Sequence, residues 1–205
     1  MSLLRLLAAA SLLALFACTS ILPHPKPPPA LYRLTALAGT GAPARVVDAQ
    51  LAVDRPSSSA ALDTDRIVLT RGPVSLDYFA DSAWTDQAPA LVQTLMVDSL
   101  QNAGAIRVVA RRSGELRADA VLACDLRQFE ARYDGDGPPV IDVELECRLV
   151  ALPGRAVLAV QRFEGTSRPA TNDLPQIVAG FDTALHDALG ALVPWVADTL
   201  ATAKR

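Results

Sequence analysis

Residues 119–152 read DAVLACDLRQFEARYDGDGPPVIDVELECRLVAL, and they contain the clearest structural pattern of the chain. Two segments rich in apolar residues, 119–133 and 139–152, flank the sequence Asp134-Gly135-Asp136-Gly137-Pro138. Aspartate, glycine and proline in such a row favour a tight reversal, so the stretch predicts an antiparallel β-hairpin. With residues 134–137 as the loop, Tyr133 faces Pro138, and this pairing fixes the register of the whole hairpin.

The predicted register gives the hairpin one apolar face and one charged face. Leu122, Cys124 and Leu126 lie opposite Leu149, Cys147 and Leu145, respectively. The other face carries five charged residues: Asp125, Arg127, Glu144, Glu146 and Arg148. Because successive side chains of a strand point to opposite faces, we expect one side of the hairpin to be core and the other to be solvated.

Further strands are predicted on both sides of the hairpin. Turn residues and apolar patterns place them at 31–35, 45–53, 66–70, 74–79, 106–110 and 156–164, with a loop at 56–59.

Two helices complete the predicted fold. The first has polar cap residues within 81–86, Pro89 in its first turn and Gly104 at its end. The second spans about 174–200, is capped by Asn172 or Asp173 and is kinked at Pro194. Its apolar stripe is Ile177, Phe181, Leu185, Leu189, Leu192, Val196 and Leu200. The fold class is α+β: a mostly antiparallel, mixed sheet with two main helices packed on one face, in a single domain.

The N-terminus predicts a secreted protein held at a membrane. Residues 1–17 carry Arg5 before a twelve-residue apolar stretch, which would span only about 18 Å as a helix and is typical of a signal peptide. Leu15-Phe16-Ala17-Cys18 looks like a bacterial lipobox, which predicts a lipid on Cys18. The alternative is plain cleavage after Ala17, which would place the bulky Leu15 where a small side chain is preferred.

The residues after Cys18 predict a spacer and a location. Thr19 stands where an aspartate would favour retention in the inner membrane, so we expect the outer membrane, with the protein facing the periplasm. The proline-rich run predicts an extended tether, which gives three parts: a signal at 1–17, the lipidated cysteine and tether at 18–30, and the domain at 31–205.

Composition and motifs exclude several classes of protein. The net charge is −3 and the pI is near 5.3, which argues against a nucleic-acid partner. Two histidines and three cysteines leave little for a metal site, and His186 has no second ligand in its pattern. Phosphate-binding loops and nucleophile elbows are also missing from the sequence. We therefore predict no catalytic residues, no metal and no cofactor apart from the covalent lipid on Cys18.

Three remaining features each have two interpretations. Cys124 and Cys147 are either a cross-strand disulfide or two small buried residues. Trp84 is either a core anchor or part of an oligomer interface. The basic residues Arg107, Arg111, Arg112 and Arg117 are either a site for an acidic partner surface or lipid headgroups, or a solvated strand end, and the last interpretation is favoured.

The order and spacing of these patterns resemble the ABC-type transport auxiliary lipoprotein family of the PqiC/YmbA type. The resemblance includes the lipobox, residues 31–34, residues 66–71 running into 76–79, Trp84, the 91–100 helix and the strand ending in Phe129-Glu130. It implies a non-enzymatic accessory or docking subunit of an MCE-type transporter of phospholipids or other hydrophobic compounds. The implied partners are an MCE-domain protein, the ABC permease and ATPase, and further copies in a homo-oligomeric ring. A stand-alone lipid-binding or envelope-assembly lipoprotein is the alternative, and an enzyme of hydrolase type ranks last.

Overall fold

The computed structural model describes residues 27–39, 41–112 and 117–203. The signal peptide, Cys18 and most of the tether therefore lie outside the described residues. The central strand is β7 (Ala120–Tyr133), which pairs antiparallel with β8 (Val140–Ala151). Leu122, Cys124 and Leu126 lie opposite Leu149, Cys147 and Leu145, as predicted.

The predicted register is wrong for the second half of the hairpin. A bulge between Leu126 and Gln128 shifts the pairing by one residue, so Arg132 lies opposite Val140. The bulge has a physical reason: Leu122, Cys124 and Leu126 are buried at even positions, whereas Phe129, Ala131 and Tyr133 are buried at odd positions. An extra residue at this point keeps both sets on the core face.

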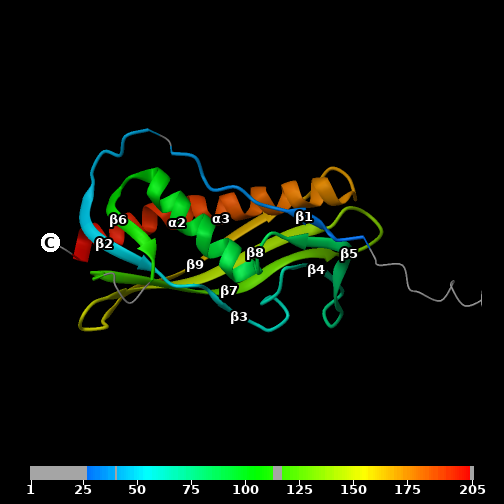
Figure 1. Ribbon diagram of the computed structural model, residues 1–205, viewed down its shortest axis with the longest axis horizontal. Coiled ribbons are helices and arrows are strands. Elements are labelled where there is room, and N and C mark those ends of the chain that lie inside the picture. The colour runs from blue at the N-terminus through cyan, green and yellow to red at the C-terminus, as the bar shows by residue number, and fades with distance from the viewer. Residues whose placement is uncertain (1–26, 40, 113–116, 204–205) are drawn as a thin grey trace, which may run out of the picture.

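A single mixed sheet of nine strands surrounds β7 in the described part of the chain (Figure 1). On one side, β8 and β9 (Val157–Ser167) complete an antiparallel meander. The other side of β7 is shared by three parallel partners, namely β2 (Val47–Val53), β3 (Ser57–Ser58) and β4 (Arg66–Arg71). β6 (Ile106–Arg111) extends the sheet beyond β2, while β5 (Leu76–Trp84) and β1 (Ala30–Tyr32) extend it beyond β4.

Three short segments differ from the prediction. The strand expected at 31–35 is β1, which already ends at Tyr32. The segment expected to be a loop, 56–59, contains the two-residue strand β3. The strand expected at 74–79 continues to Trp84, because residues 82–84 pair with β1 and are buried. The cap of the first helix is therefore not within 81–86 but at Gln87.

Two helices, α2 (Ala88–Ala103) and α3 (Leu174–Ala203), lie along one face of the sheet and touch each other (Figure 1). Gly104 ends α2 in the left-handed conformation, with φ of 64°. Asp173 caps the start of α3, and its Oδ1 accepts a hydrogen bond from the Gln176 amide at 3.1 Å. All seven residues of the predicted α3 stripe are buried. The fold is the predicted α+β single domain.

Candidate functional site: the N-terminal strap and the helix groove

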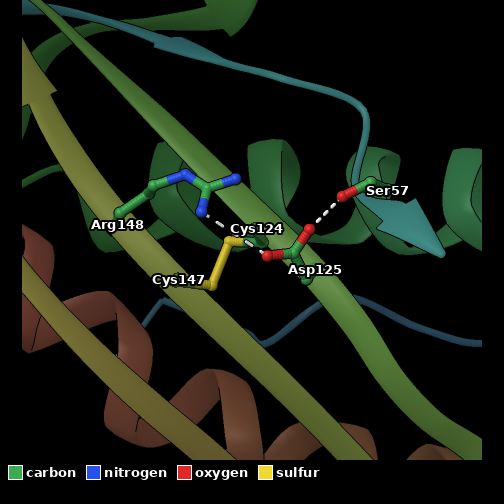
Figure 2. The surroundings of a disulfide bond; sticks show 5 residues. All are labelled: Ser57, Cys124, Asp125, Cys147 and Arg148. Atoms are coloured by element: carbon green, nitrogen blue, oxygen red, sulfur yellow. Dashed lines mark hydrogen bonds and ion pairs between the residues drawn. A yellow bond between two sulfur atoms is a disulfide. The ribbon is translucent and has the colours of Figure 1, made fainter. Parts of the chain in front are cut away.

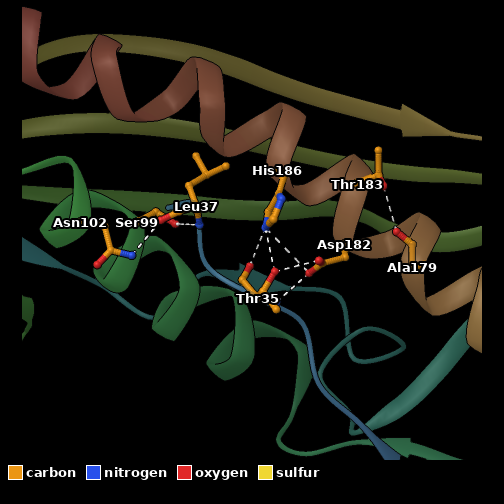
Figure 3. A network of polar contacts seen from close by, with 8 residues as sticks. All are labelled: Thr35, Leu37, Ser99, Asn102, Ala179, Asp182, Thr183 and His186. Carbon is orange, nitrogen blue, oxygen red and sulfur yellow. Dashed lines mark hydrogen bonds and ion pairs between the residues drawn. The ribbon is translucent and has the colours of Figure 1, made fainter. Parts of the chain in front are cut away.

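The chain between β1 and β2 contains an extended segment, residues 33–39, which we call the strap. It crosses the helical layer, and side chains of both helices bind its backbone (Figure 3). Leu34 anchors the strap in the hydrophobic core, with only 5% of its surface exposed. The strap closely follows the end of the predicted tether, so both helices hold the chain soon after it enters the folded domain.

α3 holds the strap at Thr35. The Thr35 amide donates to Asp182 Oδ1 at 2.6 Å, and the Thr35 hydroxyl donates to Asp182 Oδ2 at 2.8 Å. His186 Nε2 lies 2.9 Å from the Thr35 carbonyl oxygen and 3.1 Å from its hydroxyl oxygen. Asp182 and His186 are one helical turn apart, which puts both on the same side of α3.

α2 holds the strap two residues further on. The Leu37 amide donates to Ser99 Oγ at 3.0 Å, and Asn102 Nδ2 donates to the Leu37 carbonyl oxygen at 2.8 Å. Ser99 is 1% exposed, so this bond satisfies a buried hydroxyl. A Cβ on Gly39 would come within 2.4 Å of the Asn102 carbonyl oxygen, which requires glycine at the point where the strap touches α2.

An apolar groove of about 430 Å³ lies beside the strap, between the two helices. Its walls come from the strap, the end of α2 and the middle of α3, and they are mainly small or apolar: Leu37, Ala38, Ser99, Ala103, Ala105, Gly190, Val193, Pro194 and Ala197. A Cβ on Gly190 would meet nothing within 4 Å, so this side of the groove is open. The volume is in the range of pockets that hold small molecules.

Thr35, Asp182 and His186 are the residue types of a hydrolytic triad. Their hydrogen bonds, however, hold the strap against α3 and do not activate a nucleophile. A carbonyl oxygen can only accept, so His186 Nε2 carries a hydrogen when it binds Thr35 at 2.9 Å. That nitrogen cannot take a proton from the Thr35 hydroxyl, which instead donates to Asp182. The arrangement can hold the strap in place, and it lacks an activated nucleophile.

The face of the meander opposite to the helices carries the charged residues that the sequence predicted. Arg127 pairs with Glu146 at 2.8 Å, Arg148 with Asp125 at 3.6 Å and Arg162 with Glu144 at 3.3 Å. Such half-exposed pairs contribute little to stability individually.

Among the described residues, Glu130 and Asp173 have carboxyl groups with shifted pKa values. Burial raises the pKa of Glu130, and nearby Asp142 adds to the effect against the hydrogen bond from Thr70. At the start of α3, the hydrogen bond from the Thr171 hydroxyl lowers the pKa of Asp173, and the Gln176 amide lowers it further. Neither group lies in the strap or the groove.

Cys124 and Cys147 lie opposite each other in β7 and β8 and form a disulfide in the structure, with an S–S distance of 2.06 Å (Figure 2). Both are buried on the core face, whereas their neighbours Asp125 and Arg148 pair on the other face. The Ser57 hydroxyl of β3 also donates to Asp125. The disulfide therefore links the two central strands within the core, away from the strap and the groove.

Trp84 lies in the core with 1% of its surface exposed, which corresponds to the first of its two interpretations. Its ring centroid lies 5.6 Å from that of Phe129 and 5.2 Å from that of Phe181, so it joins β5 to β7 and α3. A residue this deeply buried offers no side-chain surface to a second copy of the folded domain.

Three of the four predicted basic residues lie on or beside β6 with partners of their own. Arg107 pairs with Asp48, Arg112 pairs with Asp54 at 3.0 Å, and Arg111 donates to Thr94 Oγ1 at 2.6 Å. These contacts agree with the favoured interpretation of a solvated strand end.

Sequence reasoning missed the strap. Thr35 and Asp182 are 147 residues apart in the chain, and Leu37 and Ser99 are 62 apart. No short-range pattern and no residue type identifies such pairs. In the sequence, His186 is only an isolated histidine on a predicted helix.

The described residues contain neither a cluster of metal ligands nor a helix suited to a membrane. Among residues 27–39, 41–112 and 117–203, no group of three or more histidine, cysteine or acidic side chains could hold a metal ion. Neither α2 nor α3 is long and apolar enough to cross a membrane, and the described chain has no other helix of that kind.

Comparison with known proteins gives the same fold and a family. A solved structure of protein XCC0632 from Xanthomonas campestris, of family DUF330, is 27% identical, covers 85% of this chain and 98% of its own, and superposes with a TM-score of 0.78. A second solved structure, of an uncharacterized protein, is 14% identical with a TM-score of 0.66 over 83% of this chain and 99% of its own. The second likeness shows the fold alone.

A relative from Bradyrhizobium diazoefficiens, the uncharacterized protein bll6063, is 31% identical over 165 residues, or 80% of this chain. The chain spans 44% of that relative's length. The family model described as "ABC-type transport auxiliary lipoprotein component" matches residues 32–192, from β1 to the groove-lining part of α3. A lipoprotein family of this kind is associated with the cell envelope and with ABC transport systems. The chain belongs to the ABC-type transport auxiliary lipoprotein component family.

Proposed function

We propose that the protein is a non-enzymatic docking subunit of an MCE-type ABC transport system that moves phospholipids or other hydrophobic compounds through the envelope. The family match over residues 32–192 carries this proposal. The proposed partners are an MCE-domain protein, the ABC permease and ATPase, and further copies of the chain in a ring.

The proposed position is the periplasmic side of the outer membrane, with a lipid on Cys18 and a proline-rich tether at 18–30. The lipobox and Thr19 support this position. Several acyl chains, at about 0.8 kcal/mol for each buried CH₂, would make the attachment effectively permanent. The strap supports the same arrangement, because bonds from both helices hold the chain soon after the tether.

Affinity purification from crosslinked membranes tests the proposed partnership. The full-length protein, with its own signal peptide and a C-terminal tag, should recover an MCE-domain protein together with the permease and ATPase. A tagged, unrelated outer-membrane lipoprotein is the control. Recovery of none of these subunits, with the bait itself abundant in the membrane fraction, would contradict the proposal.

The helix groove favours a second candidate function, in which the lipoprotein itself binds a lipid chain. Its apolar lining and its volume of about 430 Å³ support this alternative. Gly190→Leu would fill the groove, whereas Gly190→Ala adds a single methyl group in open space. Native mass spectrometry should then find a co-purified lipid on the wild type and on Gly190→Ala but not on Gly190→Leu. A lipid-free wild type would rule out this second function.

A further inference from the structure

The β4–β5 hairpin ends in an exposed apolar tip. Residues 71–77 are all exposed, and within them Val74 and Leu76 have 95% and 42% of their surfaces exposed. Gly72, with φ of 72°, makes the turn, and the Arg71 amide donates to the Ser75 carbonyl oxygen at 3.0 Å to close it. The turn is therefore closed by a backbone hydrogen bond, and Pro73, Val74 and Leu76 are exposed, with no cover from the described part of the chain.

The tip lies at the end of the domain where the chain arrives from the tether. β1, the first strand after the tether, pairs in parallel with residues 82–84 of β5, so the preceding residues approach from the side of the tip. Figure 1 shows the first described residues and the projecting β4–β5 hairpin at the same end of the molecule. Only residues 19–26 separate Cys18 from the first described residue, a length of about 25 Å in the extended polyproline form.

We propose that the tip of the β4–β5 hairpin, Pro73-Val74-Ser75-Leu76, rests in the surface of the membrane that carries the lipid anchor. This inference depends on the proposed anchor at Cys18. The tether is short enough to keep this end of the domain near the bilayer, and burial of an exposed valine and leucine in the headgroup region is favourable. The contact would give the domain a fixed orientation, with the 152–156 turn at the far end pointing into the periplasm.

The charged residues around the tip indicate which kind of lipid headgroup the membrane contact requires. Arg71 lies over the Tyr133 ring at 4.7 Å, and the neighbouring turn carries Asp134, which pairs with Arg132, and Asp136. This mixture of signs does not favour an anionic surface. We therefore expect the apolar side chains to carry the contact, and vesicles of zwitterionic phosphatidylcholine to be enough.

Tryptophan at position 74 tests this contact. The full-length lipoprotein carrying Val74→Trp, purified from membranes and reconstituted into phosphatidylcholine vesicles, should show an added emission that is blue-shifted and quenched by brominated phosphatidylcholine. The wild type supplies the background from Trp84 and Trp195. Val157→Trp is the matched control, because Val157 is a 57% exposed valine whose partner Val150 lies beside the opposite end of β7. Its emission should be neither shifted nor quenched.

The remaining outcomes separate the contact from the anchor. Protein that floats with the vesicles but shows no quenching at position 74, or equal quenching at 74 and 157, overturns the contact and leaves the anchor in place. A blue shift without quenching means that the tip is buried against protein, which also overturns the contact. Protein that does not float with vesicles overturns the anchor, and the contact with it.

Discussion

At Gly165 and Gly180, α3 and the meander lie too close together to leave room for a side chain. A Cβ on Gly165 would lie 1.8 Å from the Ala184 carbonyl oxygen, and one on Gly180 would lie 2.9 Å from Ile141 Cγ1. The helix can therefore lie directly on β8 and β9 only because both residues are glycines, which have no side chain. Ser167 Oγ donates to the Gly180 carbonyl oxygen at 2.8 Å and fixes the same contact.

Gly165→Ala should destabilise the protein, because the backbone of α3 must move away from β9. Overpacking of this kind costs about 1–3 kcal/mol in the free energy of unfolding. Gly190→Ala is the matched control: its Cβ meets nothing within 4 Å, and alanine favours a helix over glycine. Chemical denaturation of both variants measures the difference. Equal stability of the two would show that the close contact does not constrain the helix.

Glu130→Gln should stabilise the protein at neutral pH but not in acid. Burial raises the folded-state pKa of Glu130, so its contribution to stability is complete below the unfolded pKa and is lost as the pH rises through the folded pKa. Glutamine stays uncharged and avoids that loss, so the thermal midpoint of the variant should exceed that of the wild type at neutral pH. The two midpoints should converge in acid, below the unfolded pKa. A variant that is less stable than the wild type at neutral pH would contradict this account.

We expect the strap to detach from the helices without unfolding the rest of the domain. Asp182→Ala removes both carboxylate bonds to Thr35, each worth about 1.5–3 kcal/mol as hydrogen bonds to a charged group. Hydrogen exchange should accelerate in residues 33–39 while the amides of β7 and β8 keep their protection. Asp187→Ala, which removes an exposed carboxylate from the same helix, is the control. Unchanged exchange in the strap of the Asp182 variant would mean that other contacts hold it.

The disulfide cross-links the two strands of the β7–β8 hairpin. We propose that Cys124 and Cys147 are bonded in the native protein, where an oxidising periplasm would favour the bond. A cross-link with a sequence separation of 23 stabilises a fold by about 3 kcal/mol. The Cys124→Ala/Cys147→Ala double variant should therefore unfold at a lower denaturant concentration than the wild type. Free thiols at these two positions in the denatured wild type, before any reductant is added, would refute the bond.

At the scale of elements, local patterns predicted much of the fold and failed at specific places. The alternation in 119–152 was enough for the hairpin, and the stripe of α3 followed from its helical period. The bulge after Leu126 was missed because a one-residue shift in pairing leaves no short motif. The end of β5 was missed because Ser82 and Trp84 are strand residues through their pairing with β1, which is distant in the sequence.

At the scale of the whole molecule, three features lie along or near the first described part of the chain. The strap binds both helices, and the groove lies beside the strap. The β4–β5 tip projects at the end of the domain where the first described residues lie (Figure 1). None of these three features could be predicted from local sequence, because each joins segments that only the complete fold brings together. The proposed anchor could be predicted, because the lipobox is a short contiguous motif.

The proposed docking role depends on acylation of Cys18, which metabolic labelling can measure. Cells that express the full-length protein are grown with a clickable palmitate analogue, and the purified protein is examined for label. We predict that the wild type is labelled and that Cys18→Ala is not, while Cys124→Ala/Cys147→Ala keeps the label. An unlabelled wild type, or label that persists in Cys18→Ala, would contradict a docking subunit held to the membrane through this residue.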